Sequence, residues 1–178
     1  MTAAQPGYVI RQAAETDAEA LIAYLRALLG EPGIHLIGEP DELSLTVEAE
    51  RRLIAETTAT NNSTMLLAVA EGRIIGDITC RGDGRRAKRH VGLIGISVAN
   101  GWRDRGIGTA LMTAVIDWAR AGGVVTRLEL LVFVENVRAV HVYEKLGFQV
   151  EGRKRRAIFK HGRYQDEYLM ALLLDSDH

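Results

Sequence analysis

The spacing of apolar residues predicts a regular alternation of strands and helices along the chain. Amphipathic helices are indicated where apolar positions recur at intervals of three and four, over residues 16–29, 44–59, 106–123 and 136–147. Short β-rich runs predict one strand at 7–13, three within 63–98, one at 127–134 and two within 148–174. Residues 30–43 hold two of the three prolines, so we expect a loop that is long enough to have a function.

Polar residues and glycines mark the expected helix ends. Thr16 or Asp17 can cap the first helix, and Ser44 or Thr46 can cap the second, because short polar side chains accept hydrogen bonds from the first turn of a helix. Asn136 is expected to cap the fourth helix in the same way. Paired glycines end the third helix.

The order of these elements predicts an α/β fold. The three strands within 63–98 are separated by short polar turns, which is the pattern of an antiparallel meander. A helix and a dense apolar strand follow, and a strand, helix, strand sequence is typical of a parallel crossover. We therefore expect a mixed sheet with helices on both faces.

Composition and charge narrow the functional classes. The 178 residues are 47% apolar and 25% charged, which fits one globular domain. A net charge of −1 gives no overall attraction to nucleic acid or to anionic lipid, so neither is an expected partner. The chain shows no signal-peptide pattern and no apolar run of membrane-spanning length, so we expect a cytoplasmic protein. Cys80, the single cysteine, is expected to be a small core residue.

A cationic, glycine-containing turn precedes the third helix. In "RDRGIG", Arg103 to Gly108, two glycines lie between a buried strand and a helix start, where free backbone N–H groups can meet an anion. A Walker loop is excluded because Thr109, not lysine, follows the second glycine. A dinucleotide-binding turn is excluded because Leu111 occupies the place of its third glycine. The remaining interpretation is a turn that binds a pyrophosphate.

This turn and a second motif resemble the GCN5-related N-acetyltransferases, the GNAT family. "RDRGIG" matches the family's R/Q-x-x-G-x-G/A, and "NVRAVHVYEKLGF" at 136–148 matches its N-x-x-A-x-x-x-Y-x-K-x-G-F. The order of elements matches the family over nearly the whole chain. The resemblance implies that residues 1–178 form a single N-acetyltransferase domain. Its sheet would be seven-stranded and mostly antiparallel, with a central parallel pair that splays apart.

The resemblance implies acetyl-CoA as cosubstrate and no metal. In the family, the splayed strand end pairs with the pantetheine arm, the glycine turn holds the pyrophosphate, and an asparagine fixes the cofactor near its acetyl end. The residues that these roles assign here are Ile96, Ser97, Val98, Arg103, Asp104, Arg105, Gly106, Ile107, Gly108, Thr109 and Asn136.

Tyr143 is the expected catalytic acid. It lies seven residues after Asn136, two helical turns along the same face, so its phenol can protonate the departing thiolate of coenzyme A. A backbone N–H near Val98 is expected to polarise the thioester carbonyl. Direct attack by the amine is favoured over a covalent intermediate, because no Cys-His pair is recognisable around Cys80.

The general base is not identified by the sequence. Many relatives carry a glutamate on the strand before the glycine turn, but "HVGLIGISV" at 90–98 has no carboxylate. Asp77, Glu129, Glu135 and His90 are candidates, and a chain of water molecules is a further alternative.

The acceptor is indicated only by the end of the chain. "IFKHGRYQDEYLM" at 158–170 resembles the phosphinothricin and amino-acid acetyltransferases, which implies a small-molecule amine acceptor. Two alternatives stay open: an acetyltransferase for protein N-termini, as in the ribosomal-protein enzymes, and an acyl-CoA-binding sensor without turnover. His35 in the long loop is a candidate acceptor contact, and the basic run 85–90 fits a solvated hairpin better than a docking surface. A homodimer is compatible with the family.

Overall fold

The computed structural model describes residues 7–43 and 45–174 and has the mixed α/β architecture expected from the sequence. Within these residues the strands are β1 (Val9–Gln12), β2 (Thr64–Ala70), β3 (Arg73–Gly82), β4 (Val91–Val98), β5 (Arg127–Phe133), β6 (Gln149–Lys160) and β7 (Arg163–Leu173). The α-helices are α1 (Ala18–Leu29), α2 (Val47–Thr58), α3 (Ile107–Gly122) and α4 (Val137–Lys145). Single 3-10 turns lie at 15–17, 40–42, 86–88 and 100–102.

The strands form one sheet in the order β1-β2-β3-β4-β5-β7-β6. Only the central β4–β5 pair is parallel among the described strands, and its register runs from Val91↔Arg127 to Ile94↔Leu130. Beyond Ile94, β4 continues to pair with β3, whereas β5 continues to pair with β7. The two central strands therefore diverge, and the expected splayed parallel pair is confirmed.

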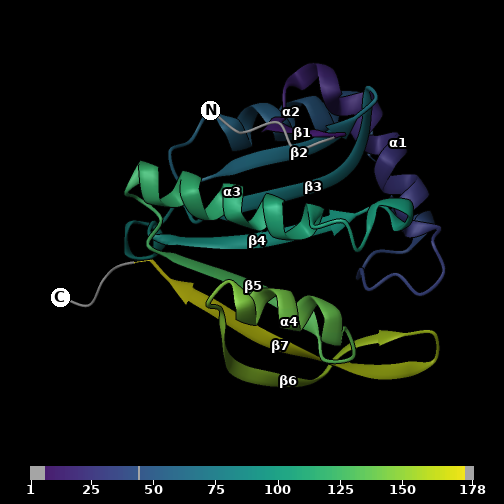
Figure 1. Cartoon of the computed structure of the whole chain (residues 1–178), viewed down its shortest axis with the longest axis vertical. Helices are drawn as coiled ribbons and strands as arrows, with labels where there is room; N and C mark the ends of the chain where they lie inside the picture. The colour runs from purple at the N-terminus through teal and green to yellow at the C-terminus, as the bar shows by residue number, and fades with distance from the viewer. Residues whose placement is uncertain (1–6, 44, 175–178) are drawn as a thin grey trace.

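Helices cover both faces of the sheet, as Figure 1 shows. The helix α3 and the residue Tyr143 of α4 pack with β3, β4 and β5 in one apolar core, in which Leu111 and Ile78 are fully buried. The helices α1 and α2 form a second core on the opposite face, where Leu28 and Ile54 pack against β2. Along β2 the side chains alternate between the two cores, with Ala68 and Ala70 in the first and Met65 and Leu67 in the second, as the period of a β-strand requires.

The helix ends follow the expected caps with one difference. Thr46 caps α2, its hydroxyl oxygen accepting a hydrogen bond from the Ala49 amide at 3.1 Å, while the alternative cap, Ser44, lies outside the described residues. Asp17 precedes α1, but its carboxylate accepts from the Ala14 amide at 2.8 Å and pairs with Arg11. The side chain of Asp17 therefore caps the 3-10 turn before α1 rather than α1 itself.

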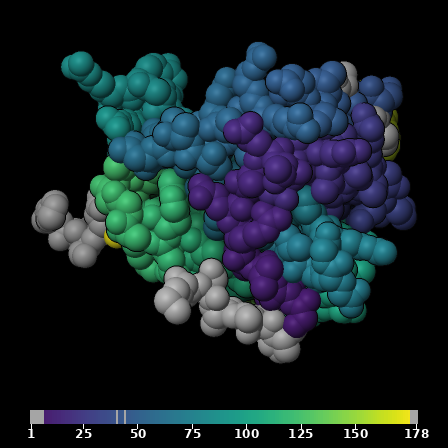
Figure 2. Space-filling model, turned by 90° about the horizontal axis from the view of Figure 1, so that it is seen from above, coloured from purple at the N-terminus to yellow at the C-terminus, as the bar shows by residue number. Residues whose placement is uncertain are grey.

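The β3–β4 connection carries the basic run 85–90 and projects from the body of the molecule in Figure 2. Its residues are exposed, and Arg85 forms an ion pair with Asp83 inside the same connection. This exposure favours the solvated hairpin. At the neighbouring strand, Cys80 is fully buried in the α3 core, and burial raises the pKa of its thiol to about 12. Among the described residues, no helix is long and apolar enough to cross a membrane.

Candidate active site

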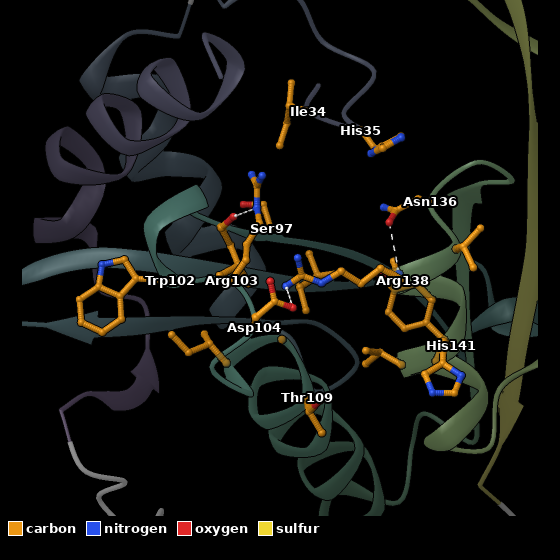
Figure 3. A pocket seen from close by; sticks show the side chains of 18 of the residues that line it. Ile34, His35, Ser97, Trp102, Arg103, Asp104, Thr109, Asn136, Arg138 and His141 are labelled. Carbon is orange, nitrogen blue, oxygen red and sulfur yellow. Dashed lines mark hydrogen bonds and ion pairs between the residues drawn. The ribbon is translucent and has the colours of Figure 1, made fainter. Parts of the chain in front are cut away.

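A cavity of about 730 Å³ opens where β4 and β5 diverge. It lies between the start of α3, the start of α4 and the loop that follows α1 (Figure 3). The predicted site residues that line it are Ile96, Ser97, Val98, Arg103, Asp104, Gly106, Ile107, Gly108, Thr109, Asn136 and Tyr143. Arg105 is not among the lining residues, because its guanidinium stacks over the Trp102 ring at 4.9 Å.

The glycine turn presents backbone N–H groups to this cavity. Gly106 precedes α3 with φ of 76°, a left-handed conformation that glycine adopts without the steric cost of a side chain. A Cβ added to Gly108 would meet only Val98, at 3.9 Å, so the protein itself leaves room at this position. The first turn of α3 has N–H groups without helical partners, and the positive end of the helix dipole lies there. This end of the cavity is suited to a phosphate group.

Arg103 differs from the sequence-based expectation in the direction of its guanidinium. Its Nε donates to the Val98 carbonyl at 2.9 Å, and another nitrogen forms an ion pair with Glu31 at the end of α1. A second oxygen of Glu31 accepts from the Asn100 amide at 3.0 Å. Arg103 therefore joins the turn before α3 to the loop after α1, a role that the sequence motif alone does not reveal.

Arg138 of α4 extends across the cavity toward the glycine turn (Figure 3). Its guanidinium lies 2.9 Å from the Asp104 carboxylate, and both side chains are at least half exposed. An exposed ion pair of this kind contributes little to stability, so it can open at small cost. Arg138 was not among the site residues predicted from the sequence, although its position two residues after the capping Asn136 places it beside the cavity.

Asn136 and Tyr143 occupy one face of α4, as their spacing predicts. The side-chain oxygen of Asn136 accepts from the Ala139 amide at 3.2 Å, which confirms the helix cap and leaves the amide nitrogen to serve a ligand. Tyr143 is buried with its ring 6.1 Å from that of Phe148. Burial raises the pKa of the Tyr143 phenol to about 12, so the group carries its proton at neutral pH.

The loop after α1 forms the opposite wall of the cavity. The lining residues in this wall are Gly33, Ile34, His35 and Leu36. The His35 ring meets the edge of Phe133, at the end of β5, with centroids 5.6 Å apart. Lys160 from β6 is almost fully buried, and its ammonium donates to the carbonyls of Leu36 at 2.9 Å and Gly38 at 3.1 Å. The loop is therefore fixed to the β6–β7 hairpin at one end and to Arg103 at the other.

The four candidate bases lie in different surroundings. His90 lies directly before β4, at the end of that strand far from the point where β4 and β5 diverge. Its carbonyl accepts hydrogen bonds from the Thr126 and Arg127 amides. Glu129 accepts from Arg127 at 2.7 Å, and Glu135 lines the cavity but is paired with Arg163 at 2.9 Å.

Asp77 is the candidate that contacts the cavity wall without a cation partner among the described residues. It lies opposite Ser97 in the β3–β4 register and accepts a hydrogen bond from the Ser97 hydroxyl. The Tyr24 hydroxyl of α1 lies 2.8 Å from the same oxygen of Ser97. Burial raises the pKa of Asp77 to about 6, and the negative charge of Glu50 adds to the rise, while the bond from Ser97 opposes it.

The described residues include no group of three or more His, Cys, Asp or Glu side chains placed to hold a metal ion. The polar groups of the cavity are backbone amides, hydroxyls, an amide side chain, the imidazoles of His35 and His141, and ion pairs. These groups can bind an anionic ligand, orient it and exchange protons with it.

Comparisons with known proteins agree on one family. Residues 34–148 match the model of the Acetyltransferase (GNAT) family. The chain is 38% identical over 110 residues to the L-amino acid N-acetyltransferase AaaT of Escherichia coli K12, a match that covers 60% of this chain and 65% of that protein. The matched stretch thus spans less than two thirds of this curated relative.

Solved structures agree with this assignment along almost the whole chain. An acetyltransferase of the GNAT family from Streptococcus pneumoniae is similar at a TM-score of 0.90 and 32% identity, covering 94% of this chain and 99% of that one. A phosphinothricin acetyltransferase from Sinorhizobium meliloti, in complex with acetyl-CoA, has the same fold at a TM-score of 0.81 and 22% identity, covering 94% and 89%. The chain therefore belongs to the GNAT family of acetyltransferases.

Proposed function

We propose that this protein transfers the acetyl group of acetyl-CoA to the primary amine of a small amino acid or amino-acid analogue, by direct attack in a ternary complex. The observation that carries the proposal is the convergence of four groups on one cavity. These are the diverging end of β4, the glycine turn before α3, Asn136 and Tyr143. The named activity of the Escherichia coli relative supports an amino acid as the acceptor.

The cofactor would lie along the edge of β4 that β5 leaves unpaired. The Ala99 amide donates to Ile75 on the β3 side at 3.0 Å, and successive amides of a strand point to opposite neighbours. The amides of Ile96 and Val98 thus lie on the splayed side, where they can pair with the pantetheine arm and polarise the thioester carbonyl. The pyrophosphate would occupy the turn from Arg103 to Thr109, and Arg138 would leave Asp104 to contact it.

The chemistry then requires protons at two positions. Tyr143 would give its proton to the departing thiolate, which a buried phenol with a raised pKa can do at neutral pH. The acceptor ammonium must lose a proton before its nitrogen can attack, and the acceptor would enter beside the loop at 33–36. Cys80 is not expected to carry a covalent intermediate, because its thiol is buried in the core and out of reach of the substrates.

The acceptor is tested by measuring thiol release from acetyl-CoA with a panel of amines. We expect turnover with small amino acids such as methionine or with phosphinothricin-like analogues. Turnover with an N-terminal peptide but with no small amino acid would replace this proposal by protein N-terminal acetylation. Acetyl-CoA binding without turnover of any amine would favour a sensor. Gly108→Val serves as the matched control, because we expect it to remove cofactor binding while an added Cβ meets only Val98 within the protein.

We also propose that residues 1–178 act as one catalytic domain in the cytoplasm, where acetyl-CoA is available, and that the chain forms a homodimer. The support for a dimer is an apolar hollow between α4 and β6, bordered by Val137, Val140 and Val150. Val137 and Val150 expose 70% and 46% of their surfaces, and exposed apolar patches often mark protein interfaces. Light scattering at micromolar concentration tests the oligomeric state.

A further inference from the structure

A chain of three polar side chains leads from the cavity wall into the layer between the sheet and α1. Ser97 lines the cavity, and its hydroxyl donates to the Asp77 carboxylate. The Tyr24 hydroxyl is hydrogen-bonded to Ser97 at 2.8 Å and is itself buried. Along β4, Ser97 alternates with Ile96 and Val98, which pack in the core on the α3 face. The chain of hydroxyls and carboxylate therefore lies on the face of the strand that α1 covers.

The charges around Asp77 leave its carboxylate available to accept a proton. Tyr24 faces it from α1, and Glu50 faces it from α2. Glu50 is buried, and its Oε2 has no hydrogen-bond partner within the described residues. Burial raises the pKa of Glu50, and the positive charge of Arg81 partly opposes that rise. The negative charge of Glu50 favours the protonated form of Asp77.

The other carboxylates around the cavity are neutralised by cations. The pairs are Glu31–Arg103, Glu39–Lys160, Asp104–Arg138 and Glu135–Arg163. A carboxylate that is held by a guanidinium or an ammonium is a weak base, because the cation stabilises its ionised form. Asp77 has no such cation partner among the described residues. Its carboxylate is connected to the cavity wall through the hydroxyl of Ser97.

We propose that Asp77 is the proton acceptor of the reaction and that Ser97 relays the proton to it. This inference rests on the proposed function. The N–H bond of the acceptor ammonium breaks as a proton passes to Ser97 Oγ, and the proton of Ser97 passes to Asp77 Oδ1. The freed electron pair on nitrogen attacks the thioester carbon, and the bond to sulfur then breaks.

The remaining protons also balance. The thiolate takes the proton of Tyr143, and the phenolate regains one from the nitrogen as the amide forms. Asp77 then releases its proton to solvent when the products leave. The net change is one amide, one free thiol and one proton, starting from an ammonium and a thioester.

The test is the pH profile of kcat/KM in Ser97→Ala and Asp77→Asn, with the exposed Asp117→Asn on α3 as matched control. At pH 7 we expect each relay variant to lose about 100-fold, at the lower end of the range for positioned base catalysis. The loss should shrink to about threefold or less at pH 9.5, where solvent deprotonates the amine. The KM for acetyl-CoA should not change. An equal loss at every pH, or wild-type kcat/KM at pH 7, would overturn the relay.

A second measurement keeps the relay separate from the proposed function. If wild-type protein acetylates no amine, the proposed function fails, and the relay is judged by carbon-13 NMR titration of the Asp77 carboxyl. A midpoint near 6 that rises in Ser97→Ala supports the link between the two groups. A midpoint near 4, or one that does not respond to Ser97→Ala, overturns it.

Discussion

Replacing Asp77 by asparagine should make the protein more stable at alkaline pH, although it should also make it a poorer catalyst. The pKa of Asp77 is raised from 3.8 in an ordinary environment to about 6 in the folded protein. The folded state therefore binds the proton more tightly than the unfolded chain does. The stabilisation from this proton is fully present below about pH 4 and is lost as the pH rises through about 6. Asparagine carries no charge at any of these pH values.

The size of the effect follows from the two pKa values. One pKa unit corresponds to 1.36 kcal/mol, so the difference between 3.8 and about 6 gives about 3 kcal/mol at most. Asp77 is partly exposed, and solvent screening reduces this to about 1–2 kcal/mol. The amide oxygen of asparagine can still accept the hydrogen bond from Ser97, so the substitution removes mainly the charge.

The assay is urea denaturation of wild type and Asp77→Asn from pH 4.5 to 8.5. The free energy of unfolding of the variant should exceed that of wild type at pH 8, and the difference should decrease toward pH 4.5. Asp166→Asn is the control of opposite sign, because the Arg156 amide and Arg153 lower the pKa of Asp166. That variant should lose stability at neutral pH. A variant at Asp77 that is less stable than wild type by the same amount at every pH would refute the reasoning.

The other predictions concern the cofactor turn, the catalytic acid and the acceptor loop. Gly108→Val should abolish acetyl-CoA binding in calorimetry while the melting temperature changes little, because a Cβ added at this position meets only Val98; undiminished binding would place the cofactor elsewhere. Tyr143→Phe should keep acetyl-CoA affinity and lower turnover at least about tenfold, provided that chemistry limits the rate; wild-type turnover would mean that Tyr143 only packs α4. Lys160→Met should cost about 2 kcal/mol or more in urea denaturation and raise the KM of the amine, because two loop carbonyls lose a charged donor; a changed KM for acetyl-CoA alone would contradict this role.

The elements that were predicted well from the sequence are determined by interactions between residues close together in the chain. The period of α3 and its glycine ends, and the cap of α4 at Asn136, depend on neighbouring residues only. The same holds for the lining of the cavity beside the glycine turn, because one turn and one helix face supply most of it. The divergence of β4 from β5 came from the family resemblance rather than from any periodicity.

The contacts that the sequence did not reveal join residues far apart in the chain. Arg103 was assigned to phosphate, yet it forms an ion pair with Glu31, 72 positions away, and Lys160 donates to the Leu36 carbonyl 124 positions away. The pairing of Asp77 with Ser97 depends on the register across the β3–β4 connection, which no pattern in residues 82–90 specifies. Such contacts follow from tertiary packing, so local patterns cannot predict them.

The short parallel pairing of β4 with β5 has a mechanical consequence. Strands β1 to β4 form one antiparallel half of the sheet and β5 to β7 form another, and only the four residue pairs from Val91↔Arg127 to Ile94↔Leu130 connect them in register. The amides of Ile96 and Val98 should exchange with deuterium early, since no neighbouring strand protects them. A ligand arm in that gap would act as a substitute strand, so its binding should slow exchange in both halves and raise the temperature at which they separate.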